Sequence, residues 1–182
     1  MSRIIARGAG VLAHFWRTDR VLTAVSLAML PVLAASLLGL WLDPRTILGA
    51  PVWLKPAKFA ASIAVYGLTL VWAFGFLPAD SRTRRSVGKL SAAVFVIEVL
   101  IIVLQAARGR SSHFNASTVF DGVLFSIMGA GILTQTVASV LAAVALYRQK
   151  FQDRALGWAL RLGLALAIVG ASFGGLMTRP TD

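Results

Sequence analysis

Five long apolar runs constrain this chain of 182 residues more than any other feature. A helix needs roughly 20 mostly apolar residues to cross about 30 Å of hydrocarbon. The runs occupy residues 21–42, 57–77, 87–107, 120–147 and 156–177. Only 14% of the residues are charged, whereas soluble domains carry about a quarter. We therefore predict an all-α fold: a polytopic transmembrane helical bundle of about five spans, forming a single domain over residues 21–182.

The N-terminal segment, residues 1–20, has a different pattern. Apolar residues such as Ile4 and Phe15 recur at helical spacing, while Arg7 and Arg17 fall on the opposite face. A helix with one apolar and one basic face is typical of a helix that lies in the membrane interface. We predict an amphipathic interfacial helix at residues 1–20.

The distribution of basic residues predicts the orientation in the membrane. Clusters at 82–89 and 148–154, together with the basic N-terminal segment, favour a cytoplasmic N-terminus and an outer C-terminus under the positive-inside rule. The net charge of +11 is spread over short segments between apolar runs. We therefore expect the basic residues to contact the lipid bilayer and its anionic head groups, and we expect no nucleic acid as a partner.

Two segments, 49–59 and 105–121, are rich in groups that bind anions or move protons. The predicted topology places both at the outer face, where Lys55, Lys58 and the forked donors of Arg108 and Arg110 form a cationic mouth. The residues expected to bind a ligand are Lys55, Lys58, Gln105, Arg108, His113 and Asn115.

Three neighbouring spans each carry polar residues seven apart, which places them on one helical face. The sets are Lys55, Ser62 and Thr69; Glu98 and Gln105; and Asp121 and Gln135, with Met128 between them. Because polar groups are costly against lipid, we expect the three faces to turn toward each other. Glu98 falls near the bilayer centre, where an isolated charge costs about 2.5–3.5 kcal/mol. Lys58 and Arg108 are its candidate partners.

The same residues are also compatible with a second hypothesis, that the protein is an enzyme. His113 can act as an acid–base group with Asp121 orienting it, and Glu98 is a third candidate catalytic group. No metal site is predicted, because the chain has no cysteine and two histidines. The sequence leaves the cofactor undetermined, and haem on His113 remains among the alternatives.

A resemblance accompanies these motifs. The sequence WLKPxKF at 53–59 and the sequence QAARGxSSHFN at 105–115 resemble a group of small bacterial integral membrane proteins of uncharacterised activity. The likeness extends over about residues 49–130. It implies a bacterial cytoplasmic (inner) membrane location and a site at the outer face, and it carries no activity to this chain.

Three functional hypotheses follow. The first is an outward-facing site between the second, third and fourth spans that binds an anionic small molecule or lipid head group, for transport, sensing or sequestration. The second is a membrane-embedded enzyme that uses the same site. The third is a non-catalytic accessory subunit of a membrane complex, or a homo-oligomer, joined through the small residues Gly170 and Gly174.

Overall fold

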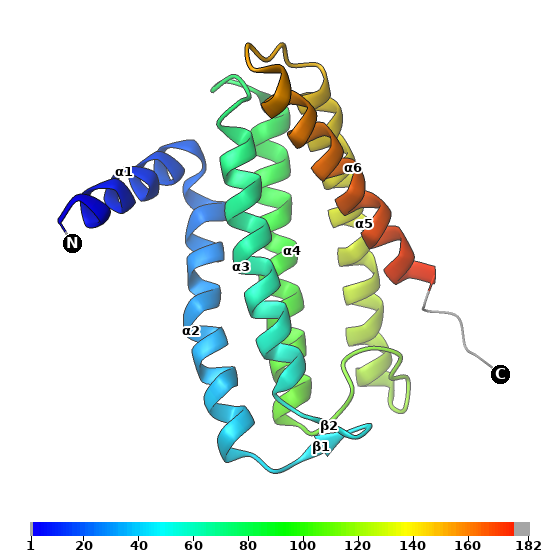
Figure 1. Cartoon of the computed structure of the whole chain (residues 1–182). Helices are drawn as coiled ribbons and strands as arrows, with labels where there is room; N and C mark the ends of the chain where they lie inside the picture. Colours follow the sequence, from blue (N-terminus) through cyan, green and yellow to red (C-terminus); the bar gives the residue numbers. More distant parts are fainter. Residues whose placement is uncertain (1, 177–182) are drawn as a thin grey trace.

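The computed structural model describes residues 2–176, with side chains described for residues 10–170. Helices make up most of this part of the chain (Figure 1). In chain order they are α1 (Ser2–Thr18), α2 (Arg20–Leu42), α3 (Leu54–Phe74), α4 (Arg82–Ala107), α5 (Val119–Tyr147) and α6 (Arg154–Leu176). The predicted all-α fold is confirmed.

Four of these helices, α2 to α5, are long and apolar enough to cross a membrane. They coincide with the first four predicted spans, although α3 begins three residues before the predicted start at 57 and α4 begins five before the predicted start at 87. The fifth predicted span corresponds to α6, which is not among the four. Whether α6 crosses the bilayer stays a prediction, and Gly174 lies outside the residues whose side chains are described.

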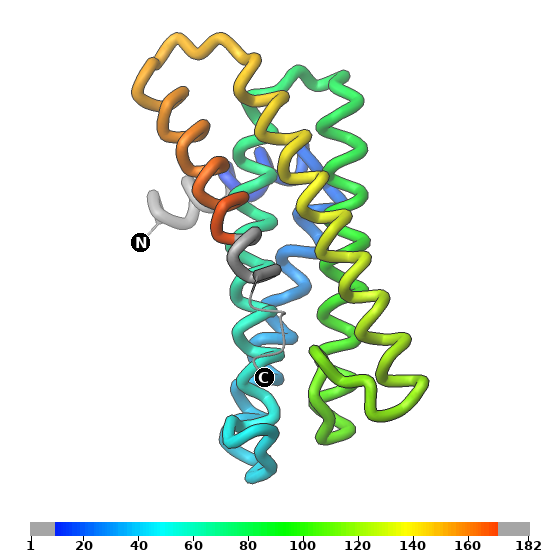
Figure 2. The backbone as a smooth tube through the Cα atoms, turned by 90° about the vertical axis from the view of Figure 1, so that its right-hand side faces the viewer, coloured from blue at the N-terminus to red at the C-terminus, as the bar shows by residue number. Residues whose placement is uncertain are grey.

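A short hairpin that the sequence analysis did not predict joins α2 to α3. Strand β1 (Thr46–Ile47) pairs antiparallel with β2 (Ala50–Pro51). Between them, Leu48 and Gly49 have φ angles of 51° and 78°, which is the two-residue turn with both φ positive that suits the twist of a hairpin. Figure 2 shows the hairpin and the α4–α5 loop at the same end of the molecule.

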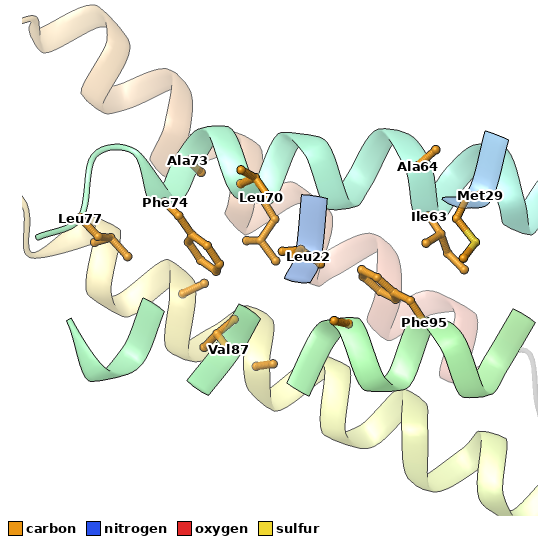
Figure 3. Packing of buried hydrophobic residues seen from close by; sticks show 14 of the residues in the cluster. Leu22, Met29, Ile63, Ala64, Leu70, Ala73, Phe74, Leu77, Val87 and Phe95 are labelled. Atoms are coloured by element: carbon orange, nitrogen blue, oxygen red, sulfur yellow. The ribbon is translucent and has the colours of Figure 1, made fainter. Parts of the chain in front are cut away.

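The core lies mainly between α2, α3 and α4, and buried residues of α5 such as Ala142 and Leu146 join it. Phe74 and Val71 of α3 and Val87 of α4 are fully buried, and Leu22 of α2 packs among them (Figure 3). In its most apolar window, α4 is 56% buried and α5 only 17%. α4 is therefore central to the bundle, whereas most of the surface of α5 is left for lipid or another partner to cover.

Small residues let α2 and α3 approach closely. A Cβ atom at Gly67 would overlap with the Ser26 hydroxyl of α2, which donates a 2.7 Å hydrogen bond to the Leu22 carbonyl. Transmembrane helices lack a strong hydrophobic drive to associate, so such close backbone contact contributes much of their packing. Gly67 is thus required by the geometry of this contact.

The predicted polar face of α3 is wrong at two of its three residues, Ser62 and Thr69. On α3, Ser62 and Thr69 are exposed, and Thr69 satisfies its hydroxyl by donating to the Val65 carbonyl at 2.7 Å. The polar group that α3 turns toward α5 is Tyr66, whose hydroxyl lies 2.8 Å from Ser139 Oγ. The seven-residue spacing was misleading here, because the hydroxyl of a serine or threonine can donate its hydrogen bond to a backbone carbonyl of its own helix.

The Gly67 contact predicts a selective loss of stability. Gly67→Ala should lower the free energy of unfolding by about 1–3 kcal/mol, the usual cost of overpacking a core. The matched change Gly129→Ala, at a glycine of α5 with nothing within 4 Å of an added Cβ, should leave the free energy of unfolding unchanged or raise it by up to about 1 kcal/mol, because alanine has the higher helix propensity. The measurement is unfolding by sodium dodecyl sulfate titration in mixed micelles. Equal losses in the two variants would contradict this packing.

Candidate functional site

The C-terminus of α4 turns sharply into the α4–α5 loop. Gly109 has a φ of 65°, and its N–H donates to the Ala106 carbonyl at 2.9 Å while Arg110 N donates to the Gln105 carbonyl at 2.9 Å. This pair of bonds is the Schellman motif, which ends a helix on a residue in the left-handed region. The QAARGR sequence therefore places Arg108 and Arg110 on either side of a fixed turn.

Asp121 is the centre of the polar network at this end of the bundle. Its side chain is buried, and Oδ1 accepts hydrogen bonds from Arg108 Nη1 at 2.7 Å and Gln105 Nε2 at 2.8 Å. On the other oxygen, Oδ2 accepts from Thr118 Oγ1 at 2.8 Å. Thr118 in turn caps α5 by accepting from the Asp121 N–H. One carboxylate thus joins the end of α4 to the start of α5.

Two of the predicted ligand-binding residues, Arg108 and Gln105, belong to this network. Arg108 pairs with Asp121, its guanidinium carbon lies 4.8 Å from the centre of the Phe120 ring, and it also hydrogen-bonds the Gln105 amide oxygen. The arginine and the glutamine are therefore engaged in fastening two helices. The pattern Thr118-x-x-Asp121 is a capping signal that could have revealed this role from the sequence.

His113 is held by Lys55 of α3. The Lys55 Nζ atom lies 2.8 Å from His113 Nδ1, and Ser112 Oγ lies 3.2 Å from the same nitrogen. An ammonium has no acceptor, so Nδ1 must accept and the ring proton is on Nε2. Burial, assisted by the positive charge of Lys55, lowers the pKa of His113 to about 4. The imidazole is therefore neutral at pH 7.

Asn115, also predicted to bind the ligand, organises its own loop. Its Nδ2 donates to the Ser111 carbonyl at 3.0 Å, and its Oδ1 accepts from Ser117 N at 3.1 Å and Ser117 Oγ at 2.7 Å. Such local bonds are how asparagine stabilises turns. With both ends of the amide engaged, Asn115 shapes the loop that carries His113.

The hairpin is fastened to the same end of α4 by a network that sequence reasoning missed. Arg45 forms a two-pronged ion pair with Asp43, with bonds of 2.9 and 2.7 Å, and reaches the Ala107 carbonyl at 3.1 Å. Trp53 Nε1 donates to Asp43 at 2.9 Å. The bonds from Arg45 and Trp53 hold the pKa of the Asp43 carboxyl well below its usual range.

A pocket of about 340 Å³ lies between the hairpin, the start of α3 and the end of α4. Apolar groups dominate its wall, among them Val52, Phe59 and Ile102. Its polar residues are Lys55, Lys58, Arg110, Ser111 and Ser112. We call this the cationic pocket. Of the predicted ligand-binding residues, Lys55 and Lys58 line it, whereas Gln105, Arg108, His113 and Asn115 are not part of its lining.

The three candidate catalytic residues are not brought together. Both oxygens of Asp121 are engaged by Arg108, Gln105 and Thr118, while His113 is bonded through Nδ1 to Lys55 and Ser112. Glu98 lines a different cavity, nearer the middle of the helices. The expected pairing of Glu98 with Arg108 is wrong, because Asp121 holds the arginine, and no ion pair joins Glu98 to Lys58 in the part of the chain that the structure describes.

The fold and this site define an all-helical protein with four helices able to span a membrane and a cationic pocket at one end. Comparison of the chain with protein-family models, with curated proteins and with solved structures finds no match in any of the three. The resemblance at residues 49–130 therefore stays an expectation.

The pKa of His113 predicts how stability depends on pH. The value is about 4 in the folded protein and about 6.5 in an unfolded chain, so the unfolded state binds more protons between these values. The contribution of the neutral His113 imidazole to the free energy of unfolding is complete above about pH 6.5 and is lost as the pH falls toward 4. Lowering the pH from 7 to 5 should cost about 1–2 kcal/mol, after allowing for partial exposure of the ring.

Thermal unfolding in neutral-detergent micelles at both pH values measures this loss. The His113→Asn variant, which cannot titrate, is the control and should show a smaller drop between pH 7 and pH 5. If the variant and the unchanged chain lose the same stability on acidification, His113 is not held neutral in the way described.

Proposed function

We propose that the cationic pocket binds an amphiphilic anion, such as a lipid with a phosphate or carboxylate head group. The supporting observation is that Lys55, Lys58 and Arg110 line one pocket while the nearby carboxylates are engaged elsewhere. Asp43 is paired with Arg45 and Asp121 with Arg108. Among the described residues, no carboxylate is left to neutralise the three cations in the pocket.

The shape and chemistry of the wall support an amphiphile rather than a small inorganic anion. Phe59, Ile102 and Ala106 form an apolar surface beside the three cations. A ligand with an anionic group and a hydrocarbon chain can contact the cations and the apolar surface at the same time. Arginine offers a planar fork that suits phosphate or carboxylate, and lysine adds mobile donors. After its bond to His113, the Lys55 ammonium has two N–H groups left for a ligand.

We further propose how the protein sits in its membrane. α6 would be the fifth span, the N-terminus would be cytoplasmic, and the cationic pocket would face the outer side of a bacterial inner membrane. α1 would lie in the opposite interface. Its described part carries Val11, Leu12 and Trp16 as exposed apolar groups, and it runs at a wide angle to α2 (Figure 1), which suits a helix resting on head groups.

Removing the two most accessible cations tests the proposal. Lys58→Gln with Arg110→Gln should weaken binding of phosphatidylglycerol about tenfold or more, because each charge-assisted hydrogen bond contributes about 1.5–3 kcal/mol before solvent screening is considered. Binding is measured by native mass spectrometry on protein titrated with the lipid in neutral detergent. Phosphatidylcholine, whose head group has no net charge, should bind the unchanged chain more weakly.

The matched control is Arg82→Gln with Lys89→Gln, which removes the same charge from the other end of the bundle. It should leave affinity for phosphatidylglycerol within about twofold of the unchanged chain, since exposed charges so far away are screened. If both double variants lose affinity equally, or neither loses it, the cationic pocket is not the binding site.

A further inference from the structure

A second cavity, of about 280 Å³, lies between α3, α4, α5 and α6. Its polar lining includes Glu98 and Gln135, with Tyr66 and Ser139 beside them. Glu98 precedes Gln105 by seven residues on α4, which is about 10 Å along the helix axis. This intramembrane cavity is therefore separate from the cationic pocket and lies deeper along the spans.

A chain of hydrogen bonds fixes the orientation of the Gln135 amide. Ser139 Oγ donates to the Gln135 backbone carbonyl at 2.8 Å, so it accepts from the Tyr66 hydroxyl, also at 2.8 Å. Tyr66 has then used its one hydrogen and can only accept, which it does from Gln135 Nε2 at 3.4 Å. The amide nitrogen is thus turned toward Tyr66, and the buried Gln135 Oε1 atom has no hydrogen-bond partner.

Among the described residues that line this cavity, every hydroxyl hydrogen is engaged. Besides Tyr66 and Ser139, the cavity is lined by Thr136, which donates to the Ile132 carbonyl at 2.8 Å. Glu98 is buried, and none of the described residues that line the cavity is basic. The described lining therefore presents the Glu98 carboxyl and one acceptor without a partner, Gln135 Oε1. A buried acceptor without a donor is costly, so this arrangement calls for a ligand that donates.

We propose that the intramembrane cavity is a binding site for a small organic cation, a protonated primary amine on an apolar body. An ammonium group carries three donors and one positive charge. The donors suit Gln135 Oε1 and the Glu98 oxygens, and the charge pairs with the Glu98 carboxylate in its ionised form. A bare metal ion fits less well, since hard cations such as calcium take six or more oxygen ligands. The volume suffices for an aromatic amine, because a cavity of about 150 Å³ holds a benzene ring.

Isothermal titration of the full chain in neutral-detergent micelles with benzylammonium chloride tests this site. Benzyl alcohol, similar in size and uncharged, should bind at least tenfold more weakly than the amine. Glu98→Gln should weaken benzylammonium binding at least tenfold by removing the charge. Ala167→Leu, which adds bulk to the cavity wall and removes none of its polar groups, should also weaken it. Lys58→Gln in the cationic pocket should leave benzylammonium binding unchanged.

Three results would overturn the proposal. The first is equal affinity for benzylammonium and benzyl alcohol. The second is unchanged benzylammonium affinity in both Glu98→Gln and Ala167→Leu. The third is displacement of the amine by sodium chloride but not by choline chloride, which would assign the site to a metal ion. Circular dichroism and a thermal melt establish that each variant is folded. If Glu98→Gln does not fold, Ala167→Leu and the alcohol comparison still decide the question. A negative result with benzylammonium does not count against the proposal for the cationic pocket, because the two sites are probed by ligands of opposite charge.

Discussion

The buried Asp121 carboxylate is the interaction on which the polar end of this bundle depends. Arg108, Gln105 and Thr118 all donate to it, so it ends one helix, starts the next and fixes the loop between them. A buried charge in this position is costly unless it is paired and hydrogen-bonded. Asp121 is paired with Arg108 and hydrogen-bonded by Gln105 and Thr118. Through the loop it also places His113 beside Lys55. The cationic pocket is therefore built on a carboxylate that does not line it.

α4 carries two sites of opposite character. Near its C-terminus, unpaired cations gather over an apolar wall, whereas in its middle Glu98 faces a cavity of acceptors. The charges are paired unevenly. Asp121 neutralises Arg108, whereas among the described residues no ion pair neutralises Lys58 or Arg110 at the cationic pocket, or Glu98 at the intramembrane cavity. Groups of this kind within a membrane are uncommon and typically mark paths or sites for ligands. This unequal pairing is the basis of the two binding sites that we propose.

Much of the fold could be predicted from the sequence, because the apolar runs and helix lengths are local properties. The positions of α2 to α5 follow directly from them. The site was harder, because it depends on which partner each charged group selects in three dimensions. Arg108 could have paired with Glu98 or with Asp121, and residue spacing alone does not decide between them. The Asp43–Arg45 pair and the Tyr66–Gln135 contact were missed for the same reason: one depends on an unforeseen hairpin, the other on a rotation of α3 that the spacing of Ser62 and Thr69 misrepresented.

A double-mutant cycle between Arg108 and Asp121 tests the central claim most directly. The variants Arg108→Gln, Asp121→Asn and their combination would be unfolded by sodium dodecyl sulfate titration in mixed micelles. If the pair joins α4 to α5 as described, each single change leaves a charge unpaired, and the double variant should lose less than the sum of the two by about 1–3 kcal/mol. Losses that add to within about 0.5 kcal/mol would show that the two residues act independently, and would contradict an Asp121 network that organises this end of the bundle.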